Sequence, residues 1–421
     1  MQGIFRGRGV KTPWHLRVLY LSTFLLRTAF GALLLLISAY FTDTPNGLLN
    51  VAIIAVPYPL AEMATANYFG ILSDRMGRKP IIVAGTTLAA VIVAFYALSD
   101  NVWYLTTLHG IHGIGAAATV APAIAMIADH AKSCDRGRQM GWFDYSTFLG
   151  YIVGAVVGGF MIELIPVPVG FLIMSGVLAI SAIMLYTMVK KEAPAGQCER
   201  RSGFAELRNV FRVREVRLIF PIWLIIATLL GLALTYLPII LLSQDVGGVW
   251  IGIMFGLAGV ALGLLQPFWG KVSDIVGRIP VMAYGVFSIA GIVVMLLFFP
   301  NSAIEMVNDE ITFKIGLIPL AIMGLGAGAF VPSALAMMAD SSESKSYGAT
   351  MGLYSFALGF GAFIAEALGL IIIKLTGENN APGWILYFAA ALVGLAVVMM
   401  VLFFFVSFVK SRFKERRAGS E

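Results

Sequence analysis

Twelve long apolar runs recur along this chain of 421 residues, and they constrain its fold more than any other feature. Each run is long enough to cross the hydrocarbon core of a bilayer, which takes about 20 residues of α-helix. Because backbone amides cannot stay unpaired in lipid, the spans must be helices or a closed barrel, and runs this continuous indicate helices. The runs are Leu16–Phe41, Leu48–Phe69, Ile81–Leu98, Val102–Ile127, Trp142–Ile165, Val169–Val189, Leu218–Leu242, Val249–Trp269, Val281–Phe299, Ile315–Met338, Met351–Leu375 and Trp384–Val409.

The composition supports an all-α membrane protein. Hydrophobic residues make up 59% of the chain and charged residues only 12%, whereas soluble domains carry about 25% charged residues. A cytosolic enzyme, a secreted disulfide scaffold and a disordered regulator are therefore excluded. The two cysteines, Cys134 and Cys198, are too few and too far apart for a disulfide framework or a metal cluster. The first apolar run is too long for the apolar core of a signal peptide.

The basic residues predict the orientation in the membrane. Twelve spans place both termini on one side, and 26 of the 29 Lys and Arg residues then lie on that same side. The positive-inside rule assigns that side to the cytoplasm, so we expect a multi-pass protein of the plasma membrane with both termini cytoplasmic. The outer loops carry acids instead, among them Asp43, Glu163 and Glu378. The net charge of +6 is thus a topology signal, and we expect no nucleic-acid partner.

The chain contains an internal duplication. The segment Gly70–Pro80 recurs as Gly270–Pro280 with six of eleven residues identical, and Gly113–Asp129 recurs as Gly324–Asp340 with ten of seventeen identical. We therefore expect two pseudo-symmetric six-helix bundles. Duplicated halves related by an axis along the membrane normal are one way in which transporters are built. The predicted domains are an N-terminal bundle over 1–189, a charged cytoplasmic linker over 190–217, and a C-terminal bundle with a basic tail over 218–421.

The loop between the second and third spans resembles motif A of the major facilitator superfamily of secondary transporters, and the resemblance covers essentially the whole chain. It implies the twelve-helix fold of that family and a loop that latches the outward-facing state. Asp74 would then lie near the start of the eleventh helix, and Arg78 would pair with acids such as Asp129. The alternative is that these charges only fix topology. The residues of the predicted latch are Gly70, Asp74, Arg75, Gly77, Arg78 and Asp129, with Asp274 and Arg278 in the second copy.

Two further motifs resemble the drug:proton antiporter branch, each with a departure. The fifth span matches the glycines of motif C but has Ala155 in place of its proline, and such glycines also serve helix packing of any kind. The fourth span matches motif B, but His109 replaces the arginine that is usually credited with handling protons, and histidine titrates near neutral pH. The motif C glycines are Gly150, Gly154, Gly158 and Gly159, and the motif B matches are Gly113, Gly115, Ala116 and Ala117.

Six ionisable residues within the spans are candidates for function. A charge at the bilayer centre costs about 2.5–3.5 kcal/mol on insertion scales, so such groups are paired, face a cavity, or act in function. The functional interpretation makes Arg27 a fixed counter-charge, while Glu62, Asp144 or His109 exchanges a proton. The alternative is a purely structural ion pair between Arg27 and Glu62 or Asp144. The predicted proton-coupling and substrate residues are Arg27, Glu62, His109, His112, Asp144 and Glu366.

These features predict a secondary transporter that works by alternating access, and most directly a proton-coupled exporter of amphipathic or drug-like molecules. A symporter or facilitator of another small solute or a lipid-like substrate stays open, because Arg27 favours an anionic substrate whereas Glu62 and Glu366 favour a cation. An intramembrane enzyme is disfavoured because H-E-x-x-H is absent, and motif A argues against a non-transporting receptor. We expect protons and a small molecule as partners, a monomer in the bilayer, no cofactor and no metal. Aromatics such as Tyr58 and Tyr236 could line an apolar cavity, although most aromatics should pack or face lipid.

Overall fold

The computed structural model describes residues 14–130, 136–189, 213–299, 304–307, 310–313, 317–340 and 347–418. Over this part of the chain, twelve segments are helical, long and apolar enough to cross a membrane. The predicted fold class, twelve helices in two related six-helix bundles, is confirmed. Most of the predicted linker, residues 190–212, lies outside the described residues.

The N-terminal bundle contains the first six spans. The second span is two helices, and the third ends in a short 3-10 turn, η1. The elements are α1 (Trp14–Phe41), α2 (Gly47–Ala55), α3 (Pro57–Met76), α4 (Arg78–Phe95), η1 (Tyr96–Leu98), α5 (Val102–His130), α6 (Arg136–Leu164) and α7 (Val167–Met188).

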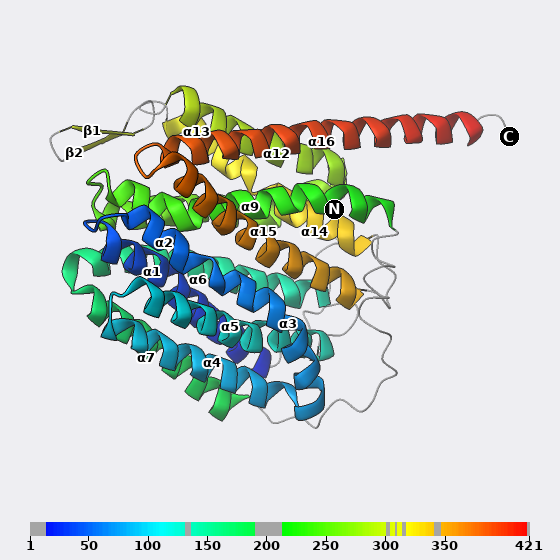
Figure 1. Cartoon of the computed structure of the whole chain (residues 1–421). Coiled ribbons are helices and arrows are strands. Elements are labelled where there is room, and N and C mark those ends of the chain that lie inside the picture. The colour runs from blue at the N-terminus through cyan, green and yellow to red at the C-terminus, as the bar shows by residue number, and fades with distance from the viewer. Residues whose placement is uncertain are drawn as a thin grey trace.

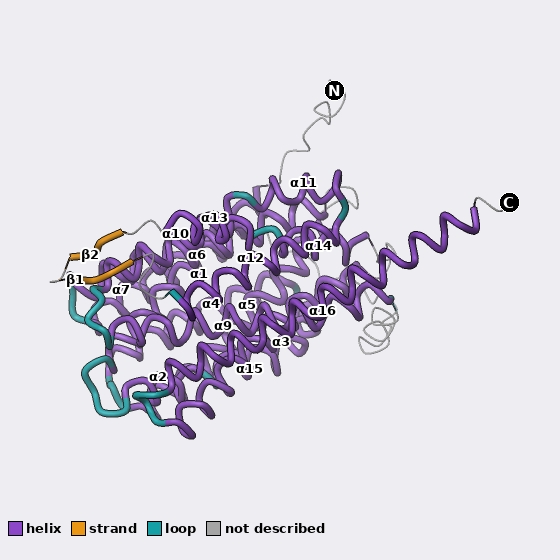
Figure 2. The backbone as a smooth tube through the Cα atoms, turned by 90° about the horizontal axis from the view of Figure 1, so that it is seen from above, coloured by secondary structure: helices purple, strands orange, loops and turns teal. Residues whose placement is uncertain are grey.

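The C-terminal bundle contains the other six spans, of which the eighth and the tenth are each two helices. Its last helix has 38 residues, about 57 Å at 1.5 Å per residue, and Figure 2 shows it extending beyond the other helices. The elements are α9 (Arg214–Leu242), α10 (Gly248–Leu264), α11 (Gln266–Val276), α12 (Arg278–Phe298), α13 (Leu317–Ala327), α14 (Phe330–Asp340), α15 (Tyr347–Thr376) and α16 (Ala381–Ala418).

A short β-hairpin, which the sequence did not predict, lies in the loop between α12 and α13. Its strands are β1 (Ile304–Val307) and β2 (Glu310–Phe313), paired antiparallel with Val307 opposite Glu310. The hairpin marks one end of the molecule, at the left of Figure 1, and α16 finishes at the other end. We call these the hairpin end and the terminal end. The turns after α1, α6, α9 and α15 all lie at the hairpin end.

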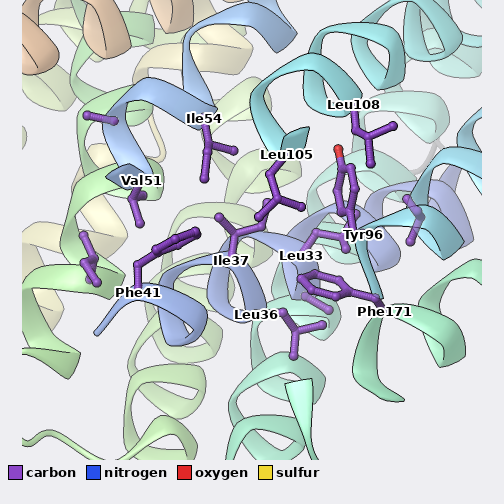
Figure 3. Close-up of a cluster of buried hydrophobic side chains, with 14 of the residues drawn as sticks. Leu33, Leu36, Ile37, Phe41, Val51, Ile54, Tyr96, Leu105, Leu108 and Phe171 are labelled. Carbon is purple, nitrogen blue, oxygen red and sulfur yellow. The ribbon is translucent and has the colours of Figure 1, made fainter. Parts of the chain in front are cut away.

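The two bundles are packed differently at the two ends. At the hairpin end, one buried apolar cluster contains residues of both bundles, with Phe41, Val51 and Ile54 from the first and Tyr236 and Ile385 from the second. Figure 3 shows part of this cluster around α1 and α2. In the terminal half, each bundle has its own cluster, and neither cluster includes buried residues of the other bundle within the described chain. The bundles are therefore joined at the hairpin end and packed separately at the terminal end.

The bundle interface is formed by the first, second and fifth spans and by their counterparts in the second half, the seventh, eighth and eleventh. The first span α1 contacts the seventh, α9, the second span (α2 and α3) contacts the eleventh, α15, and α6 of the fifth span contacts α10 of the eighth. Four of the predicted coupling residues lie on helices of this interface: Arg27 on α1, Glu62 on α3, Asp144 on α6 and Glu366 on α15. The fold thus brings residues that are far apart in the sequence to one surface between the bundles.

Candidate functional site

Arg27 is buried midway along α1 and is held by an aromatic residue of α6. Its guanidinium Nη1 donates a hydrogen bond of 3.1 Å to the hydroxyl of Tyr151, and its Cζ lies 5.4 Å from the centre of that ring. Gly150 makes this contact possible, because a Cβ there would lie 2.6 Å from the Cβ of Arg27. The Nε of Arg27 has no hydrogen-bond partner within the described residues. The arginine therefore keeps donor capacity for a further group.

Glu62 is half-buried on α3, whereas Arg27 is 8% exposed. The two side chains interact electrostatically, but no ion pair joins them in the part of the chain that is described. The structure thus does not contain the Arg27–Glu62 pair that the structural alternative proposed. The Arg27–Asp144 alternative cannot be followed, because Asp144 lies in α6 but its side chain is outside the described residues.

The two histidines of α5 form a buried cluster with two tyrosines. The hydroxyl of Tyr96 lies 2.8 Å from Nδ1 of His109 and 3.3 Å from Nδ1 of His112, so one phenol bridges both imidazoles. The ring of Tyr58, on α3, lies 5.0 Å from that of His109 and 5.2 Å from that of His112. Gly113 lets α5 approach α3 here, because a Cβ would lie 3.0 Å from Cα of Tyr58. Tyr58 is one helical turn before Glu62 and interacts electrostatically with it.

Glu366 supplies a buried carboxylate from the second bundle. Its Oε1 accepts a hydrogen bond of 3.3 Å from the hydroxyl of Thr235 on α9, and its backbone carbonyl accepts one of 2.7 Å from Tyr236. Its Oε2 is buried without a partner in the described chain. Glu366 also interacts electrostatically with Glu62 across the bundle interface. A carboxylate with one free buried oxygen can hold a proton or meet a donor group of a substrate.

The structure therefore brings five of the predicted residues into one region. Arg27, Glu62, His109 and His112 lie in the first bundle, and Glu366 faces them from the second. Together with Tyr58, Tyr96 and Tyr151 they form what we call the central cluster. No group of three or more His, Cys, Asp or Glu side chains suited to hold a metal occurs among the described residues.

The motif A loop forms a compact ion-pair network at the terminal end. Arg78, at the start of α4, contacts Asp129 at 3.0 Å and Asp74 at 2.5 Å, and it donates a hydrogen bond of 2.7 Å to Ser73. Gly77 has φ of 92° and Gly277 of 104°, a region that favours glycine. In the second copy Arg278 pairs with Asp274 in the same way. The expected contact of Asp74 with the start of the eleventh helix falls on residues 341–355, whose side chains lie outside the description.

The other two predicted latch residues, Gly70 and Arg75, have less defined surroundings. A Cβ at Gly70 would meet no atom within 4 Å, although its carbonyl lies 3.4 Å from Nη1 of Arg78. Arg75 is exposed in the last turn of α3. In this conformation, packing does not require a glycine at position 70 or an arginine at position 75.

The motif C glycines lie on two different contact surfaces. Gly150, Gly154 and Gly158 pack α6 against α1 within the first bundle, whereas Gly159 packs against Gly248 and Gly252 of α10 in the second bundle. A Cβ at Gly154 would lie 3.0 Å from the backbone nitrogen of Ala32, and one at Gly159 would lie 3.0 Å from Cα of Gly252. Helix backbones that approach this closely require residues without side chains.

Sequence reasoning missed the residues that hold the charged groups. Tyr96 and Tyr151 were not singled out, and Tyr58 was noted only as one of many aromatics. Thr235 gave no signal at all. The adjacency of Tyr151 to the motif C glycine Gly150 is the one sequence feature that pointed to it.

Twelve membrane-spanning helices in two related bundles, with charged side chains buried where the bundles meet, define the class of secondary transporters. A profile of the Major Facilitator Superfamily matches residues 19–309 and 251–420. The chain belongs to the Major Facilitator Superfamily and is a multi-pass membrane transporter.

Relatives of this chain include an antiporter and an uncharacterised transporter. It is 27% identical over 366 residues to the proton-coupled antiporter flippase LtaA of Staphylococcus aureus, covering 85% of each chain. It is 23% identical over 378 residues to an uncharacterised transporter of the superfamily from Methanocaldococcus jannaschii, covering 86% of this chain and 92% of the relative.

Solved structures share the fold at low sequence identity. The nucleoside transporter NupG superposes with a TM-score of 0.68 at 14% identity, covering 93% of this chain and 98% of NupG. A POT family transporter in complex with 5-aminolevulinic acid superposes with a TM-score of 0.73 at 12% identity, covering 94% of this chain and 96% of that one. At these identities the likeness concerns the fold and not the substrate.

Proposed function

We propose that this protein is a proton-coupled antiporter that exports amphipathic small molecules, including lipid-like ones, across the plasma membrane. The observation that carries the proposal is the central cluster, in which Arg27 is buried without a carboxylate partner in the described chain. Buried charges are costly unless they are paired or used. The relative LtaA, a proton-coupled antiporter flippase, supports both the coupling ion and a lipid-like substrate.

The cluster divides unevenly between the bundles, which supports an amphipathic substrate. The first bundle supplies Arg27, Glu62, two histidines and three tyrosines, whereas the second supplies Glu366 and Thr235. A polar group of the substrate would meet the first bundle and its apolar part the second. Arg27, with its unpartnered Nε, is suited to an acceptor such as a phosphate, carboxylate or sugar oxygen.

Proton coupling is proposed to run through Glu62. It is the half-exposed carboxylate of the cluster and it interacts electrostatically with both Arg27 and Glu366. Antiport requires that the substrate and the proton compete for the cluster. A substrate that occupies the deprotonated cluster from the cytoplasmic side would be released on the outer side when Glu62 takes up a proton there. The His109–Tyr96–His112 bridge is the second candidate proton site.

The energy of the proton gradient is sufficient for export. One proton moving down one pH unit releases about 1.4 kcal/mol, and one charge crossing 100 mV adds about 2.3 kcal/mol. Together these support a substrate gradient of several hundred-fold, since each 1.4 kcal/mol is about tenfold. No nucleotide-hydrolysing motif is needed for this mechanism.

The side of the membrane is part of the proposal. With both termini cytoplasmic, the terminal end faces the cytoplasm, and the structure, joined at the hairpin end, is an inward-facing state. Substrate would enter the central cluster between the separately packed terminal halves.

Reconstitution in liposomes tests this function. Purified protein is given an imposed pH gradient and three fluorescent probes: a lipophilic cation, a lipophilic anion and a short-chain lipid. The proposal expects at least one probe to move against the proton flux. Movement of the probes together with protons would indicate a symporter, and probe flux that is indifferent to the gradient would indicate a facilitator; either result would contradict antiport.

A further inference from the structure

At the hairpin end, each bundle places one carboxylate on the first turn of a helix that belongs to the other bundle. Glu163, near the end of α6, accepts a hydrogen bond of 2.9 Å from the backbone amide of Val249 in α10. Glu378, in the turn after α15, accepts one of 2.7 Å from the backbone amide of Leu49 in α2. The helices α2 and α6 belong to the first bundle, and α10 and α15 to the second. Each bundle therefore supplies one carboxylate acceptor to a helix of the other bundle.

The internal duplication relates the two contacts to each other. Leu49 and Val249 are separated by 200 positions, the offset that also relates the two copies of motif A. The acids lie at the ends of corresponding helices, α6 of the fifth span and α15 of the eleventh. Glu163 lies within its helix, whereas Glu378 follows its helix. The duplication therefore relates the two receiving amides, but it does not relate the positions of the two acids.

The two receiving helices do not cap themselves. The residues that precede them, Asn46 before α2 and Gly247 before α10, make no side-chain hydrogen bond to the first turn. The first amides of a helix need acceptors, and a carboxylate there also benefits from the helix dipole. A Cβ at Gly247 would lie 2.8 Å from Oε1 of Glu163, so the carboxylate lies directly beside the residue that precedes α10.

The position of Glu163 is unfavourable for its own helix. An acid in the last turn lies at the negative end of the helix dipole, which disfavours it. The amide that it meets belongs to α10, so the favourable interaction comes from the other bundle. If the only role of Glu163 were to fix the orientation of the chain in the membrane, an acid anywhere in the outer loops would serve, and no contact with α10 would be needed.

We propose that Glu163 and Glu378 form a reciprocal pair of inter-bundle caps that holds the hairpin end closed, and that both contacts break when this end opens. Both carboxylates lie at the accessible rim of the interface, since Glu163 is exposed and Glu378 half-exposed. Water can replace the carboxylate at each helix when the bundles separate, which makes the contact reversible. The inference goes beyond the proposed function, because it concerns the equilibrium between conformations without substrate or proton gradient.

Pulsed electron paramagnetic resonance on the full chain in lipid nanodiscs tests the caps. Both native cysteines are replaced by serine, and spin labels are attached at Asp100→Cys and Gln244→Cys, exposed positions of the two bundles at the hairpin end. We expect Glu163→Ala with Glu378→Ala to raise the ratio of open to closed molecules about tenfold, which corresponds to about 1.4 kcal/mol. Each single change should raise it about threefold.

Asp43→Ala is the matched control, because Asp43 is an exposed acid of the same end that lies outside both contacts. An unchanged label distance in the double alanine variant, with thermal unfolding like that of the parent, would overturn the proposal. An equal shift in the Asp43 control would overturn it as well. If the alanine pair does not fold, the pair Glu163→Met and Glu378→Met decides, because methionine is of similar size and lacks the oxygen acceptor. A shift of threefold or more supports the caps, and a smaller shift contradicts them.

Discussion

Arg27 is held by the phenol of Tyr151, and no ion pair joins it to a carboxylate within the described residues. This is what we expect of a group that binds substrate and not of a structural ion pair. A hydrogen bond and a ring contact with Tyr151 orient the guanidinium, and both are weaker than a buried ion pair in neutralising its charge. The charge therefore remains available to a substrate or to Glu62.

Tyr151→Phe tests this orientation of Arg27. The substitution keeps the ring and removes the hydroxyl that accepts from the guanidinium. Because a hydrogen bond to a charged group contributes about 1.5–3 kcal/mol, we expect the transport rate in liposomes to fall about tenfold or more with normal membrane insertion. Tyr145→Phe, an exposed tyrosine of the same helix, should keep the parental rate. Equal rates for Tyr151→Phe and the parent would exclude the orienting role.

Tyr96→Phe tests the bridge between the histidines. Removing the hydroxyl leaves two buried imidazole nitrogens without their bridging partner, which costs about 1–3 kcal/mol for an unsatisfied buried group. We expect a lower midpoint of thermal unfolding in detergent. Tyr104→Phe is the control, because its hydroxyl binds the carbonyl of Phe95 at an exposed site, and its effect should be much smaller. The bridge is unimportant for stability if the two variants melt alike.

At this scale the sequence located the charges but not their partners. The insertion cost of a charge singles out Arg27 and Glu366 without any alignment. Tyr151 carries no such signal, because a tyrosine in a membrane helix packs or faces lipid in most cases. Its partner Arg27 lies 124 positions away, a separation that only the packing of α1 on α6 closes.

Glycine contacts fix the spacing of α1 and α6 at the scale of helices. Gly154 faces the backbone of Thr28 and Ala32, so the backbones of α1 and α6 meet there without intervening side chains. The motif C pattern predicted close packing, and the same stripe was equally compatible with an antiporter role. The structure places three of the glycines inside one bundle and the fourth between the bundles.

Gly154→Ala should destabilise the protein by about 1–3 kcal/mol, because an added methyl group forces the two backbones apart. Gly176→Ala, in α7, is the matched control: nothing lies within 4 Å of its Cβ position, and alanine favours helix by up to about 1 kcal/mol. Thermal unfolding of the purified variants measures both. A neutral Gly154→Ala together with a neutral control would show that the contact is loose.

The interrupted helices could not be read from the sequence. The second and eighth spans break at Val56 and Leu265, next to Pro57 and Pro267. Yet α5 contains Pro122 and α9 contains Pro221 and Pro238 without interruption. A membrane helix tolerates proline where its neighbours satisfy the freed carbonyl groups, so the outcome depends on packing that the sequence does not display.

For the whole molecule, the duplication predicted two bundles, and hydropathy predicted the twelve spans. The conformation could not be predicted, because the same sequence must adopt states that are open to either side. In the state described here, the bundles share one apolar cluster at the hairpin end and have separate clusters at the terminal end.

The orientation of the termini is tested by cysteine labelling. Met76 and Val276 are exposed at the terminal end, at equivalent positions of the two halves. We expect Met76→Cys and Val276→Cys, in a background without native cysteines, to react with a membrane-impermeant maleimide in inverted vesicles and not in intact cells. Labelling in intact cells would reverse the topology.

Proton-driven accumulation by Glu62→Gln tests the central claim, that the two bundles alternate around a cluster whose half-exposed carboxylate carries the proton. The variant cannot bind or release a proton at position 62, while its size and half-buried setting stay nearly the same. In liposomes with an imposed pH gradient, we predict no accumulation of the transported probe by this variant, with normal insertion and continued exchange of probe for probe; Asp43→Asn should accumulate it like the parent. Full proton-driven accumulation by Glu62→Gln would contradict the account.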